Sequence, residues 1–311
     1  MYIATNEMHT GGRGITNVMP APLRRYMCSV NLDEASELLF IAGKPLIIRY
    51  PDGDYYLTSK SVLMRKDKDC AAAVIVTERN IEELLERITK SSLYSVKDQI
   101  RNGYITIEGG HRAGIAGTAV TENGSVEFIR NVSAVNIRLA EEIKGAGEAA
   151  AEYILSDTGV KSTLIISPPG AGKTTMLRDI TRILSESGFA VSVADERCEI
   201  AAMHDGRSAF DLGAMTTVMD NCPKSQAMLM LLRAMSPEVI VTDEIGTAQD
   251  GEAVRSIMNS GVAVITSAHG KNREQLMKRR EIGKLCDQFD VIITLSKRSG
   301  AGTIEEIYIN D

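Results

Sequence analysis

Tryptophan is absent from this chain, and aromatic residues make up only 5% of its 311 residues. A core built without large aromatic side chains has to be aliphatic, and the 14 methionines are expected to fill gaps in it rather than to form a binding face. No apolar run approaches the roughly 18 residues that a membrane-spanning helix needs. Residues 1–16 lack the apolar segment of a secretory signal, and we expect them to be a disordered tail.

Closely spaced cysteines are missing as well. The five cysteines, Cys28, Cys70, Cys198, Cys222 and Cys286, are odd in number, widely spaced and never arranged as C-x-x-C. This pattern argues against a disulfide framework or a zinc site and indicates reduced thiols, as in a cytosolic protein.

Basic residues do not outnumber acidic ones. The 35 lysines and arginines against 41 aspartates and glutamates give a net charge of −6, which argues against a nucleic-acid surface spread over the whole protein. A nucleic-acid motor is therefore disfavoured, although a local basic patch remains compatible with this charge. The hydrophobic fraction of 44% is ordinary for a globular protein, and the length suffices for two domains.

One stretch, residues 164–175, resembles a phosphate-binding loop. An apolar run ends in a Pro/Gly loop that opens into a helical pattern, as the motif G-x-x-x-x-G-K-[ST] requires. Gly172, Lys173 and Thr174 fill its last three fixed positions, but Ser167 stands where a glycine is expected, and glycine would adopt the backbone angles of a loop entry more easily. The alternative is a plain Gly-rich turn between a strand and a helix.

The chemistry of such a loop assigns roles to its residues. Backbone N–H groups and the N-terminus of the following helix attract phosphate, Lys173 can reach the β- and γ-phosphates of ATP, and the Thr174 hydroxyl can hold Mg²⁺. The residues expected to bind the nucleotide are Ser167, Pro168, Pro169, Gly170, Ala171, Gly172, Lys173, Thr174 and Thr175.

Further candidates follow three apolar strands. Asp243 and Glu244 end one strand, and we expect Asp243 to take part in Mg²⁺ binding and Glu244 to orient or deprotonate the attacking water. Glu196, in the run Asp195-Glu196-Arg197, competes for the water-activating role, and the sequence does not separate the two glutamates. The alternative for Glu196 and Arg197 is a solvated turn with a local ion pair.

A third strand ends in Ser267-Ala268-His269. His269 is a candidate sensor of the γ-phosphate, with Thr266 or Ser267 in support, but a histidine at a strand end is often only a satisfied polar residue. Because ligands bind at the carboxyl ends of parallel strands, the three strand ends are expected to converge above the phosphate loop.

The predicted elements fall into two groups. Residues 17–145 form an α+β domain, with a helix over 77–91 capped by Thr77, a helix over 95–102, a hairpin over 103–120, and strands at 126–129 and 133–140. From residue 146 to 311, short apolar strands alternate with helices. This alternation predicts an α/β domain with a mainly parallel sheet covered on both faces.

With these residues in view, the chain resembles the stage III sporulation protein AA family, within the traffic ATPases of type II and type IV secretion and of pilus motors. The segments that carry the resemblance are 103–107 (GYITI), 109–112 (GGHR), 136–138 (NIR), 195–201 (DERCEIA), 222–224 (CPK) and 235–246 (MSPEVIVTDEIG). Two residues depart from the pattern of this family: Ser167 in the phosphate loop, and Thr247, where a charged residue is expected.

The resemblance implies a RecA-like, ATP- and Mg²⁺-dependent ATPase that forms a homo-oligomer, a hexameric ring by analogy. It implies a place in the mother-cell cytoplasm of endospore-forming bacteria, bound to membrane proteins of a channel complex between mother cell and forespore. Asp195-Glu196 and His269 resemble the acidic and histidine boxes of the related motors. A scaffold that binds ATP with little turnover is the alternative.

Such ATPases often need an arginine to stabilise charge in the transition state. Arg112, Arg130 and Arg138 of the N-terminal domain are candidates, and at least one of them is expected to be an ordinary surface residue. We expect Arg112 or Arg138 to act on the site of a neighbouring subunit, with Arg233 and Arg255 as the alternatives.

Overall fold

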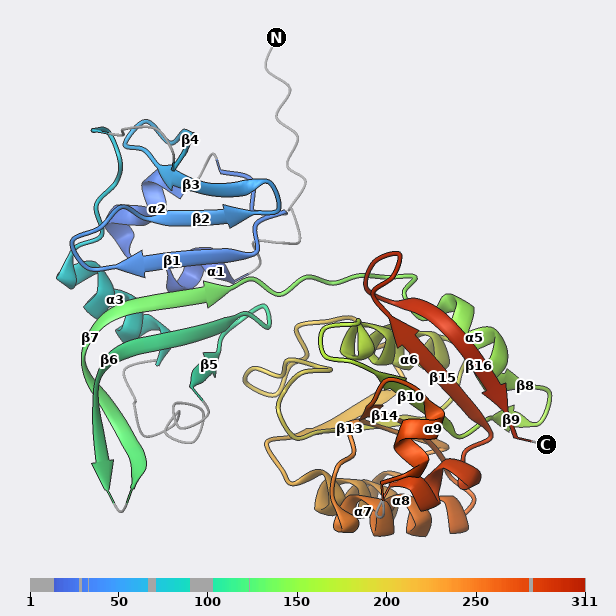
Figure 1. Ribbon diagram of the computed structural model, residues 1–311. Helices are drawn as coiled ribbons and strands as arrows, with labels where there is room; N and C mark the ends of the chain where they lie inside the picture. Colours follow the sequence, from blue (N-terminus) through green and yellow to red (C-terminus); the bar gives the residue numbers. More distant parts are fainter. Residues whose placement is uncertain are drawn as a thin grey trace. The chain divides into compact units, whose positions relative to one another are not determined.

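Two compact units make up the protein. The structure, a computed structural model, describes residues 14–27, 30–32, 34–66, 71–89, 103–122, 124–279 and 282–310 (Figure 1). The first unit comprises Met1–Glu141 with His204–Ala209, and the second comprises Glu142–Met203 with Phe210–Asp311. The domain boundary expected at residue 145 stays a prediction.

The expected disordered tail lies mostly outside the described residues. Within them, helix α1 (Ile15–Val18) already begins inside the range assigned to the tail, so the expected end of the tail at Thr16 is wrong. The reason is burial, because the side chain of Ile15 is fully enclosed in the core of the first unit.

The first unit is built on a seven-stranded antiparallel sheet with the order β4-β3-β2-β1-β7-β6-β5. Its core joins alternate residues of the central strands, such as Leu38 and Phe40, to Ile81 and Leu84 of helix α3. In chain order the elements after α1 are α2 (Ala21–Met27), β1 (Glu37–Ile41), β2 (Ile47–Tyr50), β3 (Gly53–Leu57), β4 (Leu63–Arg65), α3 (Glu78–Ile88), β5 (Tyr104–Thr106), β6 (Arg112–Glu122) and β7 (Ser125–Arg138).

Helix α3 begins as its sequence predicts. The Thr77 side chain accepts a hydrogen bond from the Asn80 N–H at 3.2 Å, and the Asn80 side chain accepts one from the Thr77 N–H at 3.0 Å. This reciprocal cap confirms Thr77 as the residue that starts the helix. The helix expected over residues 95–102 lies outside the described residues.

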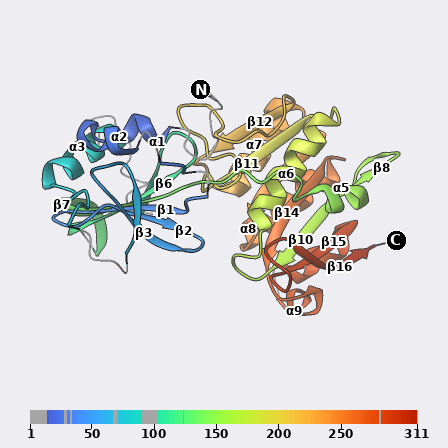
Figure 2. The same cartoon turned by 90° about the horizontal axis from the view of Figure 1, so that it is seen from above.

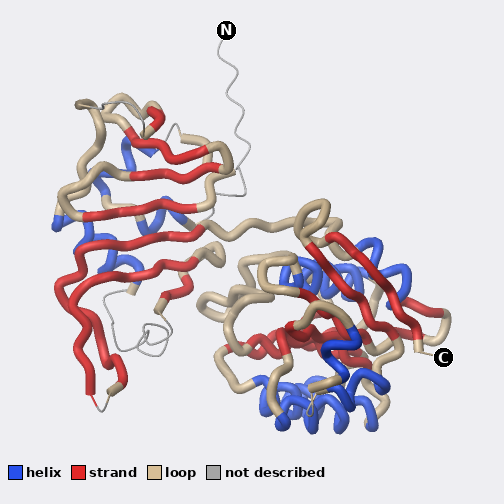
Figure 3. The backbone as a smooth tube through the Cα atoms, in the orientation of Figure 1, coloured by secondary structure: helices blue, strands red, loops and turns tan. Residues whose placement is uncertain are grey.

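Strand β7 corrects one prediction. Residues 126–129 and 133–140 were expected to be separate strands, but β7 is continuous and pairs with β6 along a two-stranded ribbon (Figure 3). The pairing shifts register between Ala116 and Thr118, opposite Asn131, which has a positive φ of 48°. A local irregularity absorbs the two extra residues of β7, and pairing resumes beyond it.

The second unit is built on a seven-stranded sheet with the order β12-β11-β13-β14-β10-β15-β16, parallel except for β16. In chain order its elements are α5 (Glu148–Ile154), β8 (Leu155–Ser156), β9 (Gly159–Val160), β10 (Thr163–Ser167), α6 (Lys173–Glu186), β11 (Val191–Asp195), β12 (Thr216–Asp220), α7 (Lys224–Met235), β13 (Val239–Glu244), α8 (Ala248–Asn259), β14 (Ala263–His269), α9 (Arg273–Met277), the 3₁₀ helix η3 (Gly283–Gln288), β15 (Val291–Ser296) and β16 (Thr303–Ile309).

Helices cover both faces of this sheet, as the apolar strands predict. Ile165 of β10 packs in one core with α5 and α6, whereas Leu164 and Ile166 pack in the other with α7 and α8. Figure 1 shows the two helix layers, and Figure 2 looks onto the side of α5 and α6. Alternate residues of a strand point to opposite faces, so a strand buried on both faces has to be apolar throughout.

Strand β12 was not predicted. It is an edge strand that pairs in parallel with β11, and its side chains are half-buried or exposed. Because an edge strand need not be apolar on both faces, its sequence TTVMD is more polar than the sequences of the central strands. It lacks the apolar run from which the central strands were predicted.

Candidate nucleotide site

The phosphate loop connects β10 to α6. Gly170 and Gly172 have φ values of 66° and 89°, a region that glycine adopts without strain. Ser167 has no positive φ, is fully buried, and its hydroxyl donates to the Pro168 carbonyl at 2.9 Å. The loop entry therefore does not need a glycine at this position, and the serine is accommodated by a local hydrogen bond.

The N-terminus of α6 faces a pocket of about 920 Å³. Gly172 is the N-cap residue, and no side chain caps the helix there, so the first-turn N–H groups are not taken by a cap. Of the nine residues expected to bind the nucleotide, Gly170, Gly172, Lys173, Thr174 and Thr175 line the pocket. Ser167, Pro168, Pro169 and Ala171 do not line it.

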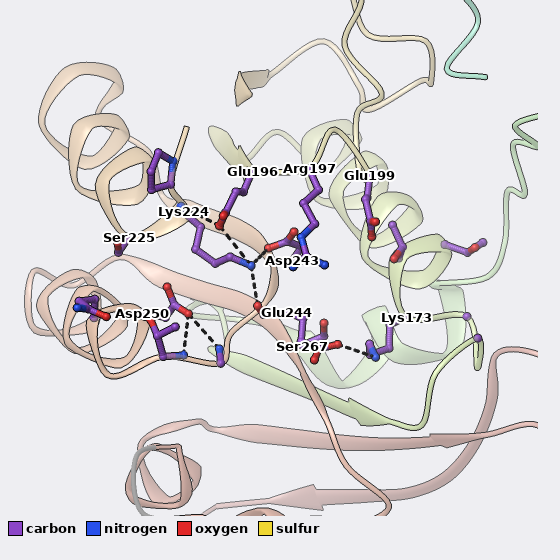
Figure 4. Close-up of a pocket in the computed structure, with 18 of the residues that line it drawn as sticks. Lys173, Glu196, Arg197, Glu199, Lys224, Ser225, Asp243, Glu244, Asp250 and Ser267 are labelled. Carbon is purple, nitrogen blue, oxygen red and sulfur yellow. Dashed lines mark hydrogen bonds and ion pairs between the residues drawn. The ribbon is translucent and has the colours of Figure 1, made fainter. Parts of the chain in front are cut away.

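The strand ends converge on this pocket. Its further lining residues are Glu196, Arg197, Glu199, Pro223, Lys224, Ser225, Gln226, Asp243, Glu244, Gly246, Thr247, Gln249, Asp250, Ser267 and Ala301. The carboxyl ends of β10, β11, β13 and β14 all contribute to it directly or through the loop that follows, and Figure 4 shows the side chains that gather there.

Glu244 lies beside the phosphate loop. Its carboxylate is 3.0 Å from the Lys173 ammonium, and the glutamate side chain is 46% exposed whereas that of Lys173 is 13% exposed. Phosphate oxygens bound by Lys173 would therefore come close to Glu244. This is the position that a water-activating carboxylate requires.

Asp243 is held in a different way. It is 6% exposed, and one of its carboxylate oxygens accepts a hydrogen bond from the ammonium of Lys224 at the start of α7 (Figure 4). Burial raises the pKa of Asp243 to about 6, and the neighbouring Lys224 acts in the opposite direction. The carboxylate thus lies at the expected strand end but already has a cationic partner.

The two acidic residues at the end of β11, Asp195 and Glu196, have different roles. Asp195 is fully buried, and its carboxylate accepts backbone hydrogen bonds from Glu199, Ile200 and Ala201 at 2.8–3.0 Å. Burial raises its pKa despite these bonds. Asp195 therefore shapes the loop, and it is the following residue, Glu196, that lines the pocket.

The same loop is fixed from α6 by Arg178. Its guanidinium donates to the carbonyls of Glu199 and Ile200 at 2.9 Å and stacks on the ring of Phe210, 3.5 Å from the ring centroid. The phosphate-loop helix and the acidic loop are thereby joined by one buried side chain. Arg197, considered above as part of a solvated turn, lines the pocket.

The third strand end gives a mixed result. His269 is paired in register with Ser167 on β10, but it is not among the residues that line the pocket. Ser267 does line it, and the buried Thr266 hydroxyl donates to the main-chain carbonyl of Asp243 at 2.8 Å. Ser267 is therefore the β14 residue that lines the pocket, and the γ-phosphate role of His269 stays a prediction.

Thr247 has a structural explanation. It is the N-cap of α8, where its hydroxyl accepts from the Asp250 N–H at 3.2 Å while the Asp250 carboxylate accepts from the N–H groups of Thr247 and Gly246 at 3.0 Å. A lysine or arginine at position 247 would lose this cap, because its side chain has no acceptor for the Asp250 N–H. Thr247 therefore fixes the turn that connects Glu244 to α8.

The candidate arginines Arg112 and Arg138 belong to the first unit. They lie directly opposite each other on β6 and β7. The Arg112 guanidinium packs over the ring of Tyr104, 4.7 Å from its centroid, and Arg138 lies 3.4 Å from Glu37 with a side chain that is 70% exposed. Arg130, further along β7, is exposed.

Comparison with known proteins decides the family. The family model described as sporulation stage III, protein AA, matches residues 12–311. Stage III sporulation protein AA of Bacillus subtilis strain 168 is 38% identical to the chain over 257 residues, which cover 80% of this chain and 83% of that protein. The chain belongs to the sporulation stage III protein AA family.

Two solved structures of ATPases share the fold of this chain. The pilus retraction motor PilT, solved with bound ADP, is similar with a TM-score of 0.56 at 16% identity, over 89% of this chain and 80% of that one. The ATPase DotB of Legionella pneumophila gives a TM-score of 0.51 at 15% identity, over 84% and 72%. The predicted RecA-like α/β fold is confirmed.

Lys224 is the residue that the sequence analysis missed as part of the site. It was quoted only within the segment CPK, and nothing in that segment alone indicates a buried lysine. The first turn of a helix is nevertheless an unfavourable place for a cation, so a lysine directly after a proline at the start of an apolar helix was the available sign that it has a specific role.

No described helix is both long and apolar enough to cross a membrane.

Proposed function

We propose that this family member is a Mg²⁺-dependent ATPase of the secretion-motor type, which energises or assembles a channel complex between mother cell and forespore. The observation that carries the proposal is one pocket that joins Lys173 and Thr174 of the phosphate loop to Asp243 and Glu244 of β13. The family relation supports the sporulation context, and the fold shared with the pilus retraction motor PilT and the ATPase DotB supports the motor.

The donors in the pocket fit a magnesium nucleotide. The Thr174 hydroxyl and the Asp243 carboxylate are oxygen ligands of the kind that Mg²⁺ takes together with phosphate oxygens. Within the described ranges no group of three His, Cys, Asp or Glu side chains is placed to hold a metal by itself. When bound, Mg²⁺ would neutralise charge that develops on the phosphates.

The chain's own residues supply the remaining steps. The N–H groups at the start of α6 and the Lys173 ammonium bind and orient the phosphates. Glu244, beside Lys173, accepts the proton of the water that attacks the γ-phosphate, so that ATP and water give ADP and phosphate. Glu196 is less suited to this role because its carboxylate lies beside Lys224, whereas that of Glu244 lies beside the phosphate-loop lysine Lys173.

Replacing each glutamate by glutamine tests this assignment. Glu244→Gln should keep nucleotide affinity and lose most turnover, about 100-fold or more, because the amide cannot accept the proton of the water. Glu196→Gln should retain much more activity. The measurement is phosphate release beside binding of a fluorescent ATP analogue.

If Glu196→Gln lost most turnover and Glu244→Gln stayed active, Glu196 would be the water-activating residue instead of Glu244. A wild-type protein that binds ATP tightly but releases no phosphate, alone or at high protein concentration, would favour the nucleotide-gated scaffold instead.

A further inference from the structure

Lys224 occupies a costly position. It is the first residue of α7, where the helix dipole disfavours a cation, and its side chain is only 10% exposed. Burying an ammonium is expensive unless carboxylates or carbonyls surround it. The contacts that this lysine makes therefore have to account for its place.

Those contacts are all with the acidic strand ends. Its ammonium donates to the Asp243 carboxylate and to the main-chain carbonyl of Glu244 at 2.6 Å, and it lies 3.8 Å from the Glu196 carboxylate. Its backbone N–H donates to the same Glu196 oxygen at 3.2 Å. One side chain thus joins the ends of β11 and β13 at the pocket wall (Figure 4).

The charge balance of the pocket makes this contact consequential. Five carboxylates line the pocket, and the three cations are Lys173, Arg197 and Lys224, so the lining carries a formal charge of −2. Without Lys224 the charge would be −3. A polyphosphate would then meet stronger repulsion, whereas a divalent cation would meet two carboxylates freed from their ammonium partner.

We propose that Lys224 is a positioning residue of the nucleotide site: it holds Asp243 and Glu196 in place and supplies the positive charge that a divalent cation would otherwise supply between them. The effect of Lys224 on nucleotide affinity rests on the proposed nucleotide-binding function, whereas its effect on divalent-cation affinity does not. Asp243 is bound through one oxygen, which leaves its other oxygen to face a metal that arrives with the nucleotide.

Two shifts of opposite sign follow for Lys224→Met. Affinity for Mn²⁺ alone, a spectroscopic stand-in for Mg²⁺, should rise about tenfold because Asp243 and Glu196 lose a competing cation. Affinity for a fluorescent ADP analogue in EDTA should fall about tenfold because the pocket becomes more negative. A merely structural lysine would lower both affinities together.

The experiment measures both affinities on the full chain, by electron paramagnetic resonance for Mn²⁺ and by fluorescence titration for the ADP analogue. Lys224→Arg keeps the charge and should restore binding of the ADP analogue at least in part. Lys284→Met is the matched control, because Lys284 is an exposed lysine of the same unit outside the pocket. Should Lys224→Met fail to fold, Lys224→Gln must show the same pair of shifts.

A loss of both affinities, or no change in either, would overturn the proposal. If the wild-type protein binds no nucleotide at all, the proposed ATPase function fails, but the Mn²⁺ titration still decides the role of Lys224. Unchanged Mn²⁺ affinity in Lys224→Met would then contradict the proposed role of Lys224.

Discussion

Lys173→Ala is expected to abolish ATP binding or hydrolysis. The ammonium lies at the start of α6, 13% exposed, and it is the phosphate-loop cation that can reach the β- and γ-phosphates. The substitution also removes the partner of Glu244, so the carboxylate would face the phosphates without a neutralising charge. Both changes act in the same direction.

The measurement is titration with a fluorescent ATP analogue together with phosphate release. Lys161→Ala is the control, because Lys161 belongs to the same unit but does not line the pocket. Turnover like that of the wild type in Lys173→Ala would show that residues 164–175 are an ordinary Gly-rich turn.

Hydrolysis is expected to depend on assembly, with Arg112 or Arg138 of one subunit acting at the γ-phosphate of its neighbour. The two arginines lie directly opposite each other on β6 and β7, a pairing of like charges that costs stability in a sheet. Glu37 partly offsets this cost at Arg138. An arginine supplied by a second subunit is worth about 10³-fold or more in turnover.

Specific activity should therefore rise with protein concentration. Mixing Lys173→Ala subunits with Arg112→Ala/Arg138→Ala subunits should restore activity, because each supplies what the other lacks. Full activity of a monomer at high dilution, or no rescue in stably mixed oligomers, would count against a shared site. Arg197, which lines the pocket of its own chain, would then be the first candidate, ahead of Arg233 and Arg255.

Local patterns in the sequence were sufficient for the framework of the site. The phosphate loop and the strand ending in Asp243 and Glu244 are each specified within about a dozen residues, because a loop needs its glycines and a strand buried on both faces has to be apolar. The parallel sheet then brings the strand ends together, as expected. The same reasoning placed Thr77 at the start of α3.

Features that depend on distant partners were not predictable in this way. Whether Asp195 faces a ligand or the chain's own backbone depends on how residues 199–201 fold back onto it. The charge state around Asp243 depends on Lys224, which comes from another element. Strand β12 and the continuity of β7 depend on pairing partners rather than on their own composition.

The most direct test of the account is phosphate release from ATP by the purified chain, measured with Mg²⁺ and with EDTA across a range of protein concentrations. We predict steady hydrolysis that requires Mg²⁺ and that Glu244→Gln lowers about 100-fold or more. Hydrolysis that is unchanged in EDTA, or no hydrolysis at any concentration despite tight ATP binding, would contradict a Mg²⁺-dependent ATPase.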